Sequence, residues 1–199
     1  KYLDEDKIAP LVPLILAVAR DESRPQEMRV AALRKIQWSE VKIDEVNRKE
    51  RDRLIVSVLD KETVPLHERL GLLWALQEAP PAAILKQLLR EVTEQSVELS
   101  GYQISPFIQF ANNDPEIIES AKPLLKTPEV VMEVARYLSG DTMAPLVDLI
   151  LAVARNESQS QAVRVAALRK IHWSQIDEES QKERDRLIVS VLDKETVPL

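Results

Sequence analysis

The sequence predicts an all-α protein, and its composition, its apolar periodicity and a long internal repeat all favour this fold class. Of the 199 residues, 45% are apolar and 30% are charged, which is typical of a soluble, folded chain. Only three glycines occur, and aromatic residues make up 4% of the chain. Since β-sheets favour aromatic and β-branched residues joined by glycine-rich turns, we expect helices throughout and almost no strand.

Apolar residues recur at helical spacing along the chain. In the stretch 9–20, Leu11, Leu14, Ile15 and Val18 fall on one face of a helix. Similar patterns predict further helices, several of which begin at a proline or directly after an aspartate or threonine cap. The predicted helices cover residues 9–20, 28–36, 51–60, 66–78, 82–92, 115–126 and 128–138.

A long stretch of the sequence occurs twice. Residues 49–66 and 182–199 share the same eighteen residues, KERDRLIVSVLDKETVPL, and the alignment extends upstream until Lys1 pairs with Arg136. Val41 and Lys42 have no counterpart in the second copy. Because insertions are tolerated where a chain crosses the surface, they predict a surface loop, and the two copies should fold alike.

The helices are organised in pairs that recur about every 34 residues, a period typical of helical repeat proteins. Stacked pairs bury their apolar faces against neighbouring pairs, so the sequence predicts an α-solenoid of antiparallel helix pairs. We expect 1–199 to form a single continuous array, in which 1–135 make one full long unit and 136–199 begin a second, near-identical unit. The chain begins with lysine and not methionine, so we also expect it to be a fragment or a processed product.

One segment, 96–113, interrupts the pattern. It contains Gly101 and Pro106, and proline removes a helical hydrogen bond and disfavours helix at the residue before it. We therefore expect two short pieces, or a turn followed by a helix from about Pro106. Tyr102 and the two phenylalanines of this segment either form a notch for a ligand or fill the space beside the kink.

Several second helices of the predicted pairs resemble HEAT repeats, whose second helix has the pattern V-R-x-A-A-x-x-A-L. The matching stretches are 28–32, 163–167 and 69–76, and Pro10 and Pro145 sit in the corresponding first helices. The resemblance implies a HEAT-like or armadillo-type right-handed superhelix with second helices along its concave face. Tetratricopeptide-type packing is the nearest alternative.

Residue types that carry out catalysis are scarce. The HEAT-like deoxyhypusine hydroxylases, which the chain resembles weakly, bind iron through several His-Glu pairs, whereas this chain has only His67-Glu68. A single pair cannot complete a metal site. The chain lacks cysteine and a phosphate-binding glycine loop. We therefore predict that it is not an enzyme and uses no metal or cofactor.

The net charge of −6 opposes general binding to nucleic acid or to anionic lipid. Arg29, Arg34 and Lys35, with their counterparts in the second copy, are too few for a strong phosphate-binding track, although HEAT-like DNA glycosylases use such a surface. No apolar run approaches the roughly 18 residues of a membrane span, so we expect no membrane partner. Cysteine content leaves the compartment open, and a cytoplasmic location is favoured.

We therefore predict a non-enzymatic scaffold that binds a protein or peptide on its concave face. Trp74 is the expected aromatic anchor, but Trp38, Trp74 and Trp173 could instead seal the core between helix pairs. The alternatives are a regulatory arm of a larger enzyme and a weak nucleic-acid-binding HEAT-like module. The predicted contact residues are Arg34, Gln37, Trp74, Gln77, Arg169 and His172.

The second copy stops before the helix that follows it in the first. The apolar face around Leu187, Val191 and Leu192 should therefore be exposed. We expect the protein to self-associate through this uncapped end.

Overall fold

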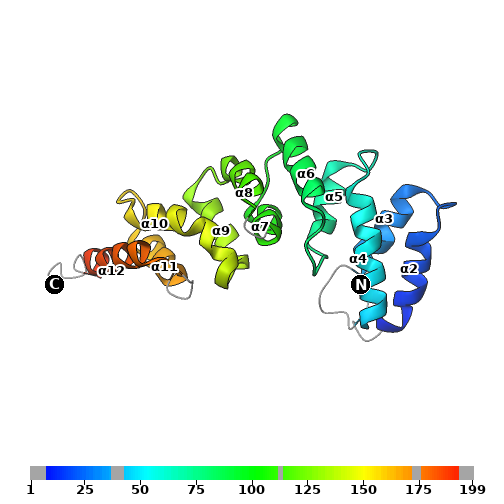
Figure 1. The fold of residues 1–199 in the computed structure, drawn as a ribbon, viewed down its shortest axis with the longest axis horizontal. Helices are drawn as coiled ribbons and strands as arrows, with labels where there is room; N and C mark the ends of the chain where they lie inside the picture. The colour runs from blue at the N-terminus through cyan, green and yellow to red at the C-terminus, as the bar shows by residue number, and fades with distance from the viewer. Residues whose placement is uncertain (1–7, 37–42, 112–113, 172–175, 193–199) are drawn as a thin grey trace. The chain divides into compact units, whose positions relative to one another are not determined.

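A computed structural model describes residues 8–36, 43–111, 114–171 and 176–192 (Figure 1). Across these ranges the chain forms eleven α-helices and three short 3-10 helices, with no β-strand. The all-α prediction is confirmed. The chain divides into two compact units, residues Lys1–Val97 and Glu98–Leu199.

The first unit contains helices whose starts are set by local sequence. Pro25, Pro65 and Pro81 stand at the N-cap positions of three of them, each in an extended backbone conformation. Asp44 caps another by accepting a hydrogen bond from the backbone N–H of Asn47 at 3.0 Å. The elements are η1 (Ala9–Leu11), α2 (Val12–Arg20), α3 (Gln26–Lys35), α4 (Glu45–Leu59), α5 (Leu66–Leu73) and α6 (Ala82–Glu94).

Helices of the second unit also begin at polar N-cap residues. Asp114 accepts a hydrogen bond from the N–H of Glu116 at 2.9 Å, and Thr127 accepts one from the N–H of Val130 at 3.4 Å. The elements are α7 (Gly101–Phe110), α8 (Pro115–Ala121), η2 (Lys122–Leu124), α9 (Pro128–Tyr137), η3 (Gly140–Leu146), α10 (Val147–Arg155), α11 (Gln161–Ile171) and α12 (Glu178–Leu192).

Two predicted helices are shorter in the structure, and the prediction for 51–60 was wrong at its start, because α4 begins at Glu45 after the Asp44 cap. The prediction for 66–78 was wrong at its end, because α5 stops at Leu73 and Trp74 is its C-cap. The prediction for 115–126 was wrong after Ala121, where the chain tightens into the 3-10 turn η2 around Pro123. Proline lacks the N–H that would continue the α-helical ladder at this point.

The expected break at Pro106 is wrong, since α7 is a single helix with this proline inside it. Proline 106 leaves the carbonyl of Tyr102 without its i+4 donor, but the hydroxyl of Ser105 donates to that carbonyl at 3.1 Å. A capping box at Ser100 also fixes the start of the helix. The side chains of Phe107 and Phe110 are buried, so they fill the interior and line no notch.

Helices α7 and α9 approach each other closely at Gly101. A Cβ added to this glycine would lie 2.6 Å from the Cβ of Glu133 and 2.8 Å from the backbone nitrogen of Val134. The Gly101 N–H donates to the Glu133 carboxylate at 3.0 Å. Beside this contact, the rings of Tyr102 and Tyr137 meet edge to face with centroids 5.6 Å apart.

The two sequence copies form the same helices. Helices α2 and α10 each have nine residues, and α4 and α12 each have fifteen. The turn that follows the first helix is also the same: Ser23 N–H donates to Asp21 at 3.1 Å, and Ser158 N–H donates to Asn156 at 3.0 Å. The insertion at Val41 lies outside the described residues.

Helices adjacent in sequence pack as hairpins within each unit. Helix α2 packs against α3, α4 against α5, and α10 against α11; α2 also contacts α4, and α3 contacts α5. Apolar side chains fill these contacts, and Leu16, Leu33 and Ile55 in the first unit and Val134 and Ile150 in the second are almost fully buried. Burial of each such side chain stabilises the fold by about 1.5–3 kcal/mol.

Candidate protein-binding groove

An arginine recurs at the fourth residue of α3, α5 and α11. The Nε of Arg29 donates to the carbonyl of Ala19 at 3.0 Å, and the Nε of Arg164 donates to that of Ala154 at 2.7 Å. Each carbonyl lies near the C-terminus of the preceding helix, where a cation offsets the partial negative charge of the helix end. Each of these two arginines therefore binds the preceding helix of its own hairpin.

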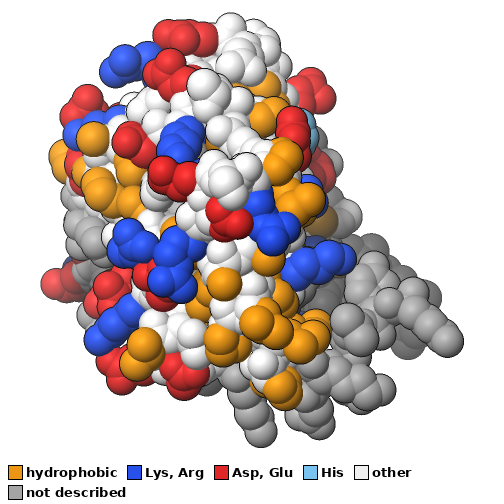
Figure 2. Space-filling view, turned by 90° about the vertical axis from the view of Figure 1, so that its right-hand side faces the viewer, with side chains coloured by type: hydrophobic (Ala, Val, Ile, Leu, Met, Phe, Trp, Pro, Cys, Tyr) orange, Lys and Arg blue, Asp and Glu red, His pale blue; other side chains and the backbone are white. Residues whose placement is uncertain are grey.

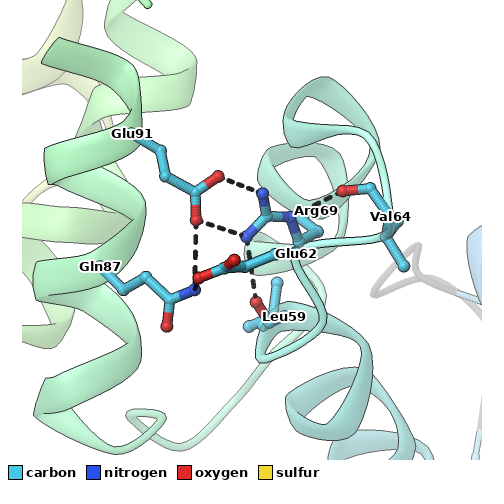
Figure 3. Close-up of polar contacts among 6 residues, drawn as sticks. All are labelled: Leu59, Glu62, Val64, Arg69, Gln87 and Glu91. Carbon is cyan, nitrogen blue, oxygen red and sulfur yellow. Dashed lines mark hydrogen bonds and ion pairs between the residues drawn. The ribbon is translucent and has the colours of Figure 1, made fainter. Parts of the chain in front are cut away.

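The third member of this set, Arg69, forms a buried polar cluster (Figure 3). Its Nε donates to the carbonyl of Val64 at 3.0 Å, and its Nη1 donates to Glu91 at 2.9 Å. Its Nη2 forms an ion pair with the other carboxylate oxygen of Glu91. Gln87 donates to both Glu91 and Glu62 at 3.2 Å. The cluster therefore ties α5 to α6.

The two charged side chains of this cluster are buried to different extents. The side chain of Arg69 is 2% exposed and that of Glu91 is 16% exposed. Hydrogen bonds from Arg69 lower the pKa of the Glu91 carboxyl, although burial alone would raise it. The arrangement is a structural ion pair in which each guanidinium nitrogen of Arg69 contacts an acceptor within the protein.

A groove of about 790 Å³ lies between α9 and α11 in the second unit. Small or apolar side chains form its floor, including Met132, Val163 and Val165. A groove of this size can hold a few side chains of a ligand. The lining residues are Pro128, Glu129, Met132, Glu133, Arg136, Ala162, Val163, Val165, Ala166, Arg169 and Lys170.

Some charged residues of the groove are hydrogen-bonded within the protein, and others are not. Glu133 accepts the hydrogen bond from Gly101, and Lys170 donates from Nζ to the carbonyl of Leu138 at 3.0 Å. Burial lowers the pKa of Lys170. Arg136 and Arg169 are exposed and form no hydrogen bond or ion pair with the residues that the structure describes. Two guanidinium groups are therefore available where α9 and α11 end.

The predicted contact residues fall in different surroundings. Arg34 is exposed in the last turn of α3, and Arg169 is exposed in the groove. Gln77 is exposed, and its Oε1 accepts a hydrogen bond from Arg48 at 2.9 Å. Trp74 is half-buried at the C-terminus of α5. Gln37 and His172, like Trp38 and Trp173, lie outside the described residues.

Sequence reasoning missed the contribution of α9 to the groove. Glu129, Met132, Glu133 and Arg136 follow one another at helical spacing, which places them on one face. This periodicity could have identified the face. It could not have shown that the face lies opposite α11, more than thirty residues later in the chain.

The face drawn in Figure 2 shows Lys and Arg side chains lying among Asp and Glu, without separation by sign. Among the residues the structure describes, no three His, Cys, Asp or Glu side chains lie close enough together to hold a metal ion. No helix in the described ranges has the length and apolar character needed to cross a membrane.

Comparisons with protein-family models, with curated proteins and with solved structures found no match to this chain.

Proposed function

We propose that this chain is a non-enzymatic protein-binding scaffold and that the groove between α9 and α11 holds a peptide segment of its partner. The observation that carries the proposal is the combination of an apolar floor with two unengaged arginines at one end. Apolar surface supplies the binding energy of such a site, and a few fixed polar groups supply its orientation and specificity.

The chemistry of the groove defines the ligand it would bind. Met132, Val163 and Ala166 suit one or two apolar side chains, such as leucine or phenylalanine. Arg136 and Arg169 suit a carboxylate, because guanidinium groups bind carboxylates through paired hydrogen bonds. The proposed ligand is thus a short apolar peptide segment flanked on one side by aspartate, glutamate or a chain terminus.

The wider proposal is a HEAT-like α-solenoid, a right-handed superhelix in which second helices form the binding face. The hairpins α2–α3, α4–α5 and α10–α11 and the contacts of α2 with α4 and of α3 with α5 support it, since solenoids repeat such contacts. Arg34, Trp74 and Gln77 would contact the partner from the first unit.

A protein partner is favoured over nucleic acid because several basic side chains are hydrogen-bonded within the fold. Arg29 and Arg164 bind helix carbonyls, Arg69 binds the carbonyl of Val64, and Lys170 binds the end of α9. These groups are therefore unavailable to phosphates. The net charge of −6 acts in the same direction.

The proposal is tested by selecting peptides from a random displayed library on the intact chain. We expect enrichment of peptides with adjacent apolar and acidic residues. The variant Ala166→Glu/Arg169→Glu should weaken binding of the selected peptides at least about tenfold, because it places carboxylates at an exposed apolar position and at the cationic end.

The internal repeat supplies a matched control. Ala31 and Arg34 occupy the same positions in α3 as Ala166 and Arg169 in α11, and all four residues are exposed. The variant Ala31→Glu/Arg34→Glu changes the charge equally but leaves the groove intact, so it should retain most of the binding. Equal loss in both variants, or no selected peptide sensitive to either, would refute the groove as the site.

A further inference from the structure

Helices α4 and α12 have the same sequence over 49–59 and 182–192. In the first copy, α4 packs against α2 and α3 and also against α5. As a result, Leu54 is 7% exposed and Ile55 is fully buried. The α4–α5 contact is therefore an established interface for this helix sequence.

The same residues are less covered in α12. Leu187 and Ile188, the counterparts of Leu54 and Ile55, are half-buried. Val189 is 58% exposed, whereas its counterpart Val56 is half-buried. Three adjacent apolar side chains of α12 thus lie open to solvent to an extent that their counterparts do not.

One turn after Leu187, the side chain of Val191 is covered as that of Val58 is in α4. Val191 is 1% exposed, because α10 and α11 pack against α12 in the way that α2 and α3 pack against α4. The predicted exposed face around Val191 was therefore wrong at this residue, and the side chain of Leu192 lies outside the description. The open surface consists of Leu187, Ile188 and Val189, which we name the α12 face.

We infer that the α12 face binds a partner helix with the sequence pattern of α5. In α5 the leucines at positions one, five and eight, Leu66, Leu70 and Leu73, are buried, and this helix packs on α4. Since α12 repeats residues 49–59 of α4 without change, a helix that presents the same leucine spacing fits it. The inference is independent of the groove between α9 and α11.

The fourth residue of the partner helix adds a polar requirement. Arg69 at this position donates from Nη1 to the carbonyl of Leu59, the last residue of α4, at 3.5 Å. The corresponding residue of α12 is Leu192. An arginine on the partner helix would donate to the Leu192 carbonyl, where the helix end is electronegative. The pattern L-x-x-R-L-x-x-L therefore describes the partner.

The inference is tested with a synthetic peptide of residues 62–97, which includes α5 and α6, because a helix as short as α5 is unstable alone. Hydrogen exchange measured by mass spectrometry on the intact chain should slow at least about threefold in α12 when the peptide is added. Identical fragments from the two copies have identical masses. The fragments compared must therefore extend upstream to include Arg48 or Gln181, where the copies differ.

Two controls give the experiment its specificity. A peptide carrying Leu70→Asp and Leu73→Asp should give no protection. In the intact chain, Val189→Asp should abolish protection, while Ser190→Asp, at a neighbouring exposed position of the same helix, should retain it. Because both sites are exposed, the fold should tolerate either change.

Two results would overturn the inference. Equal protection by the native and the substituted peptide would show non-specific binding. If the peptide gave no protection, but sedimentation showed that the chain alone forms a dimer that Val189→Asp dissociates, the occupant would be the α12 face of a second copy and the α5-type assignment would be wrong.

Discussion

Replacement of Arg69 by methionine should be among the most damaging single changes in the first unit. Methionine keeps much of the apolar volume but removes every donor of the guanidinium group. The carbonyl of Val64 then loses its donor, and the carboxylate of Glu91 loses its ion-pair partner. Glu91 would retain only the hydrogen bond from Gln87 while its side chain is 16% exposed.

The size of the effect follows from this burial. Breaking a buried ion pair by removing one partner costs about 3–5 kcal/mol, because an unpaired charge remains in the interior. The matched control is Arg29→Met, which removes one hydrogen bond to the carbonyl of Ala19. Loss of a single hydrogen bond to a charged group costs about 1.5–3 kcal/mol, and half-burial of Arg29 favours the lower value. The cost for Arg69 should therefore be about twice that for Arg29.

The assay is urea denaturation followed by tryptophan fluorescence. Trp173→Phe confines the fluorescence to Trp38 and Trp74, both of which belong to the first unit. The free energy of unfolding of that unit can then be measured even if the second unit unfolds separately. A second substitution, Glu91→Leu, should recover about half of the loss, because it removes the unpaired carboxylate and leaves only unbonded carbonyls.

Two outcomes would refute the reasoning. A cost for Arg69→Met no larger than that for Arg29→Met would mean that the ion pair with Glu91 adds nothing to the carbonyl bonds. A double variant no more stable than Arg69→Met alone would mean that the buried carboxylate is not the source of the cost.

Two further predictions concern packing and pH. Gly101→Ala should lower the free energy of unfolding by about 1–3 kcal/mol, since its Cβ would clash with α9. Gly71→Ala, whose Cβ would meet no atom within 4 Å, should raise the free energy of unfolding by about 0.5–1 kcal/mol. Urea midpoints measured by circular dichroism compare the two variants. An equal loss in both would contradict the close approach. The pKa of Glu91 is lowered from 4.5, so its contribution to stability is complete above that pH and is lost as pH falls through the lower, folded pKa. Stability measured from pH 6 to pH 2 should therefore fall less steeply in Glu91→Gln than in the parent, and parallel curves would contradict the assignment.

The helices could largely be predicted from sequence because their causes are local. Apolar residues at a spacing of three and four define a helix face, and Asp114 and Thr127 define helix starts. Pro106 shows the limit of such reasoning. The rule that proline breaks a helix fails there because the hydroxyl of Ser105 replaces the missing donor, a rotamer-level detail that composition does not show.

The candidate site could be predicted only in part. Arg169 was identified from its place on a second helix. Met132 and Arg136 were not identified, because only the folded structure places their helix face opposite α11. The side chain of Gln77 accepts a hydrogen bond from Arg48, which lies 29 residues earlier in the chain, so this contact does not follow from local sequence.

The sequence by itself determined the all-α class, the starts of α5, α6, α8 and α9, and the recurrence of similar helices in both copies, since each depends on residues within a few positions of one another. The tertiary structure alone decided which faces are covered. Leu54 and Leu187 occupy the same place in identical sequences, yet the first is buried and the second half-buried. The reason is physical: a side chain's exposure depends on the neighbour that packs against it, and α5 packs on α4.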